Sequence, residues 1–388
     1  MSRLALEGLR VIECGERVSA AYASKLLADL GAEVVKVESP EGDVARRRGP
    51  YPGGAVDPER SGLYLYLNTN KRGVVLDTHA AEGRAALHAL ARQADLLIHN
   101  VPPRDMAARG LAYEALAEVN PRLVLTSITP FGLGGPHNER EATDLTLWNA
   151  GGIAYLNGGG PDAEELPPLK PFGHQAEFQG GVNAAIASLG AVFARRRTQR
   201  GQHVVISIQQ ALAAILELTF EYWPYQGLIA SRLGRKPIQP LDFLECKDGW
   251  VFICCVEEHQ WHEFIRMIGE PEWAGIELFA DRLSRGANWD ALKIFLQEWA
   301  SEQSVLDVYH AAQQRRIPFA PVSTMGDLLA SEHLKARGFF ATLDSGGAPL
   351  TVPGAPYRFS ATPWSIRRPA PRLGQHTAEV LREIGIEA

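Results

Sequence analysis

The chain opens with two apolar runs of strand length on either side of a stretch with helical spacing. "LRVIEC" (residues 9–14) precedes "AAYASKLLADLG" (20–31), in which apolar residues recur at helical intervals before a glycine, and "AEVVKVESP" (32–40) follows. This order predicts a βαβ unit, in which the strands are parallel and the crossover is right-handed. The fold class predicted for the chain is therefore α/β.

Two further apolar runs extend this pattern. "ADLLIHN" (94–100) and "PRLVLTSITPFG" (121–132) each follow helix-like sequence, so roughly the first 130 residues predict an open α/β sheet. Such sheets bind ligands beyond the carboxyl ends of their strands. We expect the loop "GERVS" (15–19) and the residues after Glu38 to line that crevice. No GxGxxG motif follows the first strand, which disfavours a nicotinamide or flavin enzyme.

Composition places the chain among globular proteins. It has 388 residues, enough for two domains, with 46% hydrophobic and 22% charged residues. The net charge of −6 gives no reason to expect nucleic acid or an anionic membrane as a partner. No apolar run reaches the roughly 18 residues needed to span a bilayer, and no signal-peptide core precedes the first strand.

The cysteines and histidines predict neither disulfides nor a metal site. Cys14, Cys246, Cys254 and Cys255 form no CxxC motif, and the eleven histidines show no HExxH or paired metal spacing. We therefore expect buried thiols, no metal, and a cytoplasmic protein.

Residues 170–197, "KPFGHQAEFQGGVNAAIASLGAVFARRR", place Glu177 at the start of a helix of small residues. A carboxylate there is stabilised by the helix dipole by about 0.3–1 kcal/mol, so helix capping is a sufficient explanation. The functional alternative is that the dipole keeps the acid ionised and ready to attack. Gly180 and Gly181 would then let a thioester approach closely. The pattern alone leaves both interpretations open.

A second candidate site is "NTNKRGVVLD" (68–77), which puts Lys71 and Arg72 before a predicted strand. Such a pair suits a phosphorylated ligand as a charged clamp, although basic residues in turns are mostly solvated.

The order of the motifs resembles the class III coenzyme A transferases, the CaiB/BaiF or formyl-CoA transferase group. The matching pieces run almost from end to end: "LEGLRVIEC", "KLLADLGAEVVKVESPEGD", "LNTNKRGVVLD", "ADLLIHN", "NPRLVLTSITPFGLGGP", "RRRTQRGQHVVISIQQA", "RIPFAPV" and "PRLGQHTAEVL".

The resemblance implies a Rossmann-like large domain, built from residues 1–220 and 327–388, and a smaller α+β domain at 221–326. It also implies ring-shaped chains that interlock as a dimer, with the active site where the large and small domains meet. The implied activity moves CoA from an acyl-CoA to a carboxylic acid through enzyme-bound anhydride and thioester intermediates. Acyl-CoA is then a substrate, and no permanently bound cofactor is expected.

The family's nucleophile is an aspartate, and its position falls on Glu177, which is one methylene longer. Asp144 is a second acid that would orient the substrate. CoA binding by resemblance falls on residues of four loops: Arg17, Val18, Ser19, Lys36, Glu38, Asn70, Lys71, Arg72 and Asn100, with Arg104 in place of an arginine that the family often has two residues after that asparagine.

Two alternatives stay open. The family includes transferases with two different subunits. The chain is therefore either the catalytic chain of a homodimer, or a non-catalytic subunit that binds CoA beside an aspartate-bearing paralogue. An α-methylacyl-CoA racemase is disfavoured, because Thr143 precedes Asp144 where a His-Asp pair is expected. Succinyl-CoA is one candidate donor. The aromatic run "FEYWPY" (220–225) suits a bulky acid, although core packing is the commoner fate of such rings.

Overall fold

The computed structural model describes residues 4–158, 165–232, 238–343 and 349–387. The chain forms two compact units, Met1–Arg232 with Gly338–Ala388, and Leu233–Arg337. The predicted limits at residues 220 and 326 lie a little before these divisions and stay a prediction. Part of the predicted linker, residues 233–237, lies outside the described residues.

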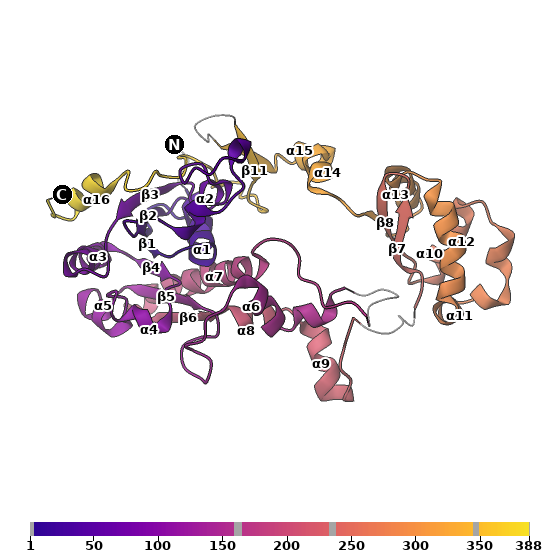
Figure 1. Ribbon diagram of the computed structural model, residues 1–388, viewed down its shortest axis with the longest axis horizontal. Coiled ribbons are helices and arrows are strands. Elements are labelled where there is room, and N and C mark those ends of the chain that lie inside the picture. Colours follow the sequence, from indigo (N-terminus) through magenta and orange to yellow (C-terminus); the bar gives the residue numbers. More distant parts are fainter. Residues whose placement is uncertain (1–3, 159–164, 233–237, 344–348, 388) are drawn as a thin grey trace. The chain divides into compact units, whose positions relative to one another are not determined.

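The first unit contains a parallel sheet whose described strands pair in the order β3-β2-β1-β4-β5-β6 (Figure 1). This confirms the predicted α/β class with a parallel sheet, which gains a strand beyond the first 130 residues. The strands are β1 (Arg10–Cys14), β2 (Glu33–Glu38), β3 (Lys71–Val75), β4 (Leu96–His99), β5 (Val124–Thr129) and β6 (His203–Ser207).

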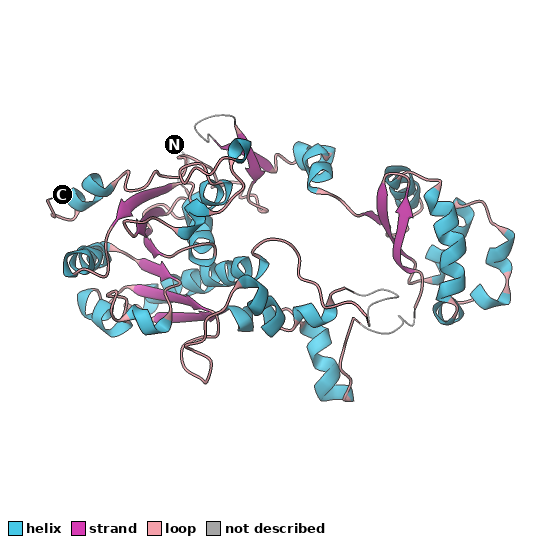
Figure 2. Ribbon diagram, viewed as in Figure 1, coloured by secondary structure: helices cyan, strands magenta, loops and turns pink. Residues whose placement is uncertain are grey.

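Helices cover both faces of this sheet because successive residues of each strand point to opposite sides. Val11 packs into a core cluster with α1 (Ser19–Asp29) and α7 (Gln175–Thr198). Its neighbour Ile12 packs into a second cluster with α3 (Ala81–Gln93). Figure 2 shows these helix layers on either side of the strands. The remaining helices of the unit are α2 (Gly62–Leu67), α4 (Pro103–Met106), α5 (Tyr113–Val119), α6 (Asp144–Ala150), α8 (Ile208–Ala213), α9 (Glu217–Gln226) and α16 (Thr377–Glu383).

The edge strand β3 is covered by the C-terminal segment. The Asn70 N–H donates to the Arg368 carbonyl over 3.0 Å, and Gly73 and His376 exchange two hydrogen bonds. The Val75 N–H donates to Thr377 Oγ1 over 3.0 Å. A covered edge cannot pair with another chain, so the two ends of the sequence complete one unit. A hairpin of β10 (Phe340–Leu343) and β11 (Leu350–Pro353) precedes this segment.

Two local expectations are corrected. Lys71 and Arg72 are the first residues of β3 rather than a turn before it. The aromatic run lies in α9, which has no buried residue, so its rings do not pack into the core of this chain.

The second unit combines a small antiparallel sheet with helices. The predicted hairpin is confirmed as β7 (Leu241–Cys246) and β8 (Gly249–Cys254), and β8 also pairs with β9 (Ala320–Pro321). Its core holds Phe264, Leu292 and Phe319. The helices are α10 (Glu258–Met267), α11 (Arg282–Ala287), α12 (Trp289–Ser301), α13 (Val305–Gln314), α14 (Met325–Ala330) and α15 (Glu332–Ala336). In the described part of the chain, no helix combines the length and apolar character needed to cross a membrane.

Candidate active site

A cavity of about 480 Å³ lies beyond the carboxyl ends of β1 and β4. These strands are neighbours at the point where the strand order reverses, and open α/β sheets bind ligands at such a switch point. The predicted crevice loops are confirmed as lining residues, together with α6 and the start of α7. The polar and charged side chains that line the cavity include Arg17, Ser19, Glu38, Asp43, Asn100, Arg104, Thr143, Asp144 and Glu177.

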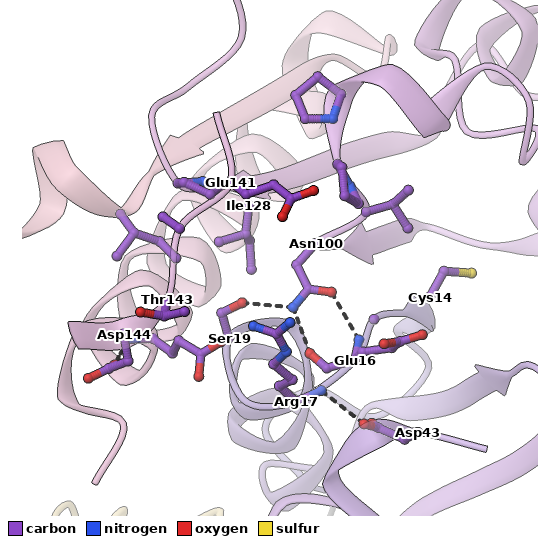
Figure 3. A pocket seen from close by; sticks show the side chains of 18 of the residues that line it. Cys14, Glu16, Arg17, Ser19, Asp43, Asn100, Ile128, Glu141, Thr143 and Asp144 are labelled. Carbon is purple, nitrogen blue, oxygen red and sulfur yellow. Dashed lines mark hydrogen bonds between the residues drawn. The ribbon is translucent and has the colours of Figure 1, made fainter. Parts of the chain in front are cut away.

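Asn100 fixes the loop that joins β1 to α1 (Figure 3). Its Oδ1 accepts from the Glu16 N–H over 2.9 Å, and its Nδ2 donates to the Glu16 carbonyl over 2.7 Å and to Ser19 Oγ over 3.0 Å. Arg17 has a positive φ of 62°, and its N–H donates to Asp43 Oδ1 over 2.9 Å. Val18 at the N-cap of α1 has no side chain that accepts a hydrogen bond. The first N–H groups of this helix therefore depend on other partners, as in helix N-termini that bind anions.

Behind this loop, a buried ionic network joins three strands. Lys36 Nζ lies 2.8 Å from Glu13 Oε1 and 2.8 Å from Asp43 Oδ2, and Lys71 Nζ lies 2.9 Å from Glu13 Oε2. Burial alone would raise the pKa of Glu13, but the two lysines lower it to about 2. Burial would lower the pKa of Lys36, yet Asp43 and Glu13 hold it well above the ordinary value. For Lys71, burial outweighs the attraction of Glu13 and lowers the pKa to about 8.

Of the residues predicted to bind CoA, some line the cavity and others lie outside its lining. Arg17, Ser19, Glu38, Asn100 and Arg104 line the cavity. Lys36, Lys71 and Val18 are fully buried and lie outside its lining. Asn70 donates to Asp29 Oδ1 and the Ser365 carbonyl, and Arg72 contacts Glu379 and Glu383 of α16, away from the crevice. The assignment of these residues to CoA binding stays a prediction.

Two of the cavity-lining charges are already paired. Glu38 accepts from Arg46 Nε over 2.7 Å and from the Tyr64 hydroxyl over 2.9 Å, which fixes its carboxylate. Arg104 donates to Glu141 over 2.6 Å, and both side chains are exposed, so this pair is free to exchange partners.

Glu177 lies in the first turn of α7 and is 7% exposed. Its N–H donates to Asp144 Oδ1 over 3.0 Å, and Lys170 Nζ lies 2.9 Å from Asp144 Oδ2. His174 Nδ1 lies 3.0 Å from Glu177 Oε2. The neighbouring Glu177 carboxylate raises the pKa of His174 above its ordinary value, although burial opposes it. The two candidate acids are thus brought together at one wall of the cavity, each beside a basic side chain.

Gly180 and Gly181 are required for helix packing rather than for the approach of a substrate. A Cβ on Gly180 would lie 2.8 Å from Ile208 Cγ1, and one on Gly181 would lie 2.8 Å from the Ser19 carbonyl oxygen. These positions let α7 pack closely against α8 and α1, and the space is filled by protein. The expectation that they admit a thioester is corrected.

His174 and Lys170 were not predicted from the sequence. The i, i+3 spacing of His174 and Glu177 at a helix start was the available signal for the first, because such residues share a helix face. Nothing in the sequence pairs Lys170 with Asp144. One ligand-type atom of each of Asp144, His174 and Glu177 lies within 4.8 Å of the others. The Lys170 ammonium already balances charge there, and the expectation of no metal stays a prediction.

The family model "CoA-transferase family III" matches residues 6–377. The chain belongs to this family. It is 34% identical to the succinyl-CoA:(R)-benzylsuccinate CoA-transferase subunit BbsE of Thauera aromatica, across 95% of this chain and 91% of that protein. It is 30% identical to the succinyl-CoA–L-malate CoA-transferase beta subunit of Chloroflexus aurantiacus, across 98% and 94%.

The solved structure of a CaiB/BaiF family protein from Brucella suis has the same fold as this CoA-transferase. The TM-score is 0.89 at 30% identity, and the match covers 99% of this chain and 100% of that one. The family resemblance found in the sequence is therefore confirmed.

Proposed function

We propose that this CoA-transferase moves CoA from an acyl-CoA thioester to a free carboxylic acid with Glu177 as the nucleophile. The observation that carries the proposal is the position of Glu177. Its carboxylate is mostly buried at a helix N-terminus and lines the crevice cavity, and the motif order places it, by resemblance, where the family's nucleophilic acid is expected. A helix N-terminus favours the ionised form, which is the form that attacks.

The reaction proceeds in four steps, in which the Glu177 carboxyl is bonded in turn to the donor acyl group, to CoA and to the acceptor acyl group. Glu177 Oε1 attacks the thioester carbonyl and expels the CoA thiolate, which leaves a mixed anhydride. The thiolate then attacks Glu177 Cδ, a C–S bond forms, and the donor acid leaves as a carboxylate. The acceptor carboxylate attacks the same Cδ and releases the thiolate. That thiolate finally attacks the acceptor's carbonyl, which frees Glu177 and the new thioester.

In this proposal CoA occupies the crevice, held by the loop that Asn100 fixes. Arg17 and Arg104 supply positive charge for its phosphates, and the start of α1 supplies backbone N–H donors. Lys36 and Lys71 act at a distance by holding Glu13 and Asp43, and Asp43 in turn anchors the Arg17 backbone. No permanently bound cofactor is required by these steps.

We further propose succinyl-CoA as the donor and a dicarboxylic acid as the acceptor. The support is that the relatives named above act on succinyl-CoA with benzylsuccinate or L-malate. A cytoplasmic location agrees with this substrate and with four cysteines that are all free thiols.

The proposed oligomer is a ring-shaped, interlocked dimer. Its support is apolar surface that this chain leaves uncovered: Phe193 of α7 is 68% exposed, and Phe220 and Trp223 of α9 are 64% and 62% exposed. Large exposed apolar side chains on neighbouring surface are typical of protein–protein interfaces. The first hypothesis is a homodimer. The second is a heterodimer in which this chain binds CoA and an aspartate-bearing paralogue carries out the reaction. Glu177 in place of an expected aspartate, and relatives named as subunits, favour this second hypothesis.

The test uses the purified chain alone with succinyl-CoA and ¹³C-labelled succinate, so that the acid released by the donor also serves as the acceptor. We expect label to enter succinyl-CoA, and hydroxylamine to trap a hydroxamate on the peptide that contains Glu177. Glu177→Gln should abolish both signals, whereas Glu118→Gln on the exposed face of α5 should change neither.

Exchange that appears only after a paralogue is added, with the adduct on the paralogue, would support the non-catalytic subunit. Exchange of a substrate α-proton with solvent, without any acceptor acid, would indicate a racemase instead.

A further inference from the structure

His174 takes no part in the steps above, yet it is the side chain that contacts the Glu177 carboxylate. Its Nδ1 is buried and lies 3.0 Å from Oε2, within ion-pair distance but not in hydrogen-bond geometry, while about a third of the side chain stays exposed. The ring therefore lies against one carboxylate oxygen, where a rotation of the imidazole aligns Nδ1–H with Oε2, and it still exchanges protons with water. Oε1 has no such contact to a histidine and is the oxygen left to attack.

The residues around His174 favour a ring that carries a proton on Nδ1. Glu177 and Asp144 face it with negative charge, and Arg48 is the opposing positive charge. Lys170 partly balances Asp144. Glu177 accepts only if Nδ1 donates, because a carboxylate has no proton to give at neutral pH.

The chemistry puts negative charge on the oxygen that this proton contacts. Once Oε1 is bonded to the acyl group, Oε2 becomes the carbonyl oxygen of the anhydride. When the CoA thiolate attacks Cδ, the C–S bond forms and the carbonyl electron pair moves onto Oε2. The pair returns as the donor carboxylate leaves. The same charge develops when the acceptor carboxylate attacks the glutamyl thioester.

We propose that His174 is a catalytic residue that donates its Nδ1–H to Glu177 Oε2 and stabilises the negative charge of these tetrahedral intermediates. The proton stays on His174 throughout, so no proton transfer is needed. The proposal rests on the proposed role of Glu177 as nucleophile.

This role also accounts for a glutamate at a position where the family has an aspartate. A longer side chain has one more rotatable bond, and a near-attack geometry tolerates little misplacement. The ion-pair contact with His174 restricts that freedom at one oxygen, while the hydrogen bond from the Glu177 N–H to Asp144 fixes the backbone of the same residue.

The test compares His174→Ala, His174→Gln and His79→Ala in the exchange of ¹³C-succinate into succinyl-CoA, and repeats it with the acid and thioester pairs of acetate and glutarate. His79 is an exposed histidine of the same unit and serves as the matched control. Loss of one oxyanion donor typically costs about 10²–10³-fold in kcat. We expect His174→Ala to lower kcat by about 10²-fold with little change in KM, and His174→Gln, which keeps a donor, to recover part of it.

A second measurement needs no substrate. In protein labelled with [2-¹³C]histidine, the NMR signal lost in His174→Ala reports the pKa of His174. We expect that pKa to lie above the ordinary value of about 6.5 in the wild type and to fall in Glu177→Gln. An unchanged pKa in Glu177→Gln would overturn the contact itself.

The outcomes separate the two proposals. If hydroxylamine traps Glu177 in the wild type but His174→Ala keeps its kcat, or loses activity only through KM, the role of His174 is overturned while Glu177 stands. If Glu177→Gln exchanges label as fast as the wild type, the nucleophile is wrong, and the role of His174 falls with it.

Discussion

The length of the Glu177 side chain brings its carboxylate within reach of His174. Shortening the acid in Glu177→Asp withdraws the carboxylate by roughly an ångström from His174 Nδ1, which lies 3.0 Å from Oε2 in the wild type. We expect kcat for succinate exchange to fall by about 10²-fold, with KM for succinyl-CoA nearly unchanged. An exchange rate equal to that of the wild type would contradict a glutamate-specific geometry.

Asn100 is the residue on which the crevice loop depends. Asn100→Ala removes three hydrogen bonds to the Glu16 backbone and Ser19, so the start of α1 loses its fixed position. We expect KM for the acyl-CoA to rise about tenfold, with a smaller change in kcat, as in loss of a positioning contact.

The matched control for Asn100 is Asn120→Ala. Asn120 donates to the Ala91 and Ala94 carbonyls at the opposite end of β4, so its loss should lower stability but leave KM unchanged. A tenfold rise of KM in both variants would show that the effect of Asn100 is general destabilisation.

The sequence predicted those cavity-lining residues that lie in the loops directly after the strands. Asn100, Ser19 and Arg17 follow recognisable strands, and the carboxyl ends of parallel strands meet at one edge. The sequence did not distinguish Lys36 or Lys71 as buried, because a residue's charge does not reveal its partner. Glu13 inside the apolar run "LRVIEC" was the overlooked signal, since an acid in a buried strand requires a partner.

Among the elements, β1, β2 and β3 are tied together by charge as well as by their hydrogen-bond ladders. Glu13 is paired in register with Lys36 of β2 and also contacts Lys71 of β3. Glu13→Gln leaves two buried ammonium groups with too little negative charge, and breaking a buried ion pair costs about 3–5 kcal/mol. We expect urea unfolding to show a loss of that order.

Glu33→Gln provides the comparison for Glu13, because it makes the same chemical change in β2. Glu33 and Arg10 are both exposed and 3.9 Å apart, so the expected loss in unfolding free energy is below about 1 kcal/mol. Equal losses in the two variants would contradict a stabilising network.

A buried histidine at the end of β4, in contact with β5, makes the stability of the fold depend on pH. His99 is buried, accepts from the Val101 N–H at Nδ1, and contacts Ser127 Oγ through Nε2 over 2.7 Å. Burial, with smaller effects of His203 and Arg109, lowers the pKa of His99 to about 3. The folded state therefore binds fewer protons than the unfolded state between about pH 6.5 and pH 3.

Stability contributed by neutral His99 is complete above about pH 6.5 and declines as the pH falls towards 3, by up to about 1.4 kcal/mol per pH unit. We expect urea unfolding to give a lower free energy at pH 5 than at pH 7, and His99→Gln to reduce the difference. Equal differences in the two proteins would contradict a neutral buried His99.

Across the whole molecule, the uncovered aromatic side chains of α9 predict assembly. If Phe220 and Trp223 lie in a dimer interface, the double variant Phe220→Ser, Trp223→Ser should shift the molar mass measured by light scattering towards one chain. Leu306→Ser, at a 58% exposed position of α13, should leave it unchanged. A wild-type protein that is already monomeric would contradict the proposed dimer.

The sequence predicted the sheet because strand and helix periods differ in the first 130 residues, and it predicted the β7–β8 hairpin from its turn. It did not predict that α9 would lack buried residues, because an aromatic run has the same appearance in a core and at an interface. Nor does periodicity tell which strand the C-terminal segment covers, since that contact uses backbone groups of β3.

The cover over β3 has a consequence for how the protein is made. The backbone partners of Asn70 and Gly73 are residues 368 and 376, about three hundred positions later in the chain. During translation the sheet therefore forms with one open edge, which persists while the ribosome synthesises the second unit. A nascent chain in this state presents the unpaired donors and acceptors to which holding chaperones and aggregating neighbours both bind. The exposure ends only when the segment around residues 368–376 has been synthesised and pairs with β3.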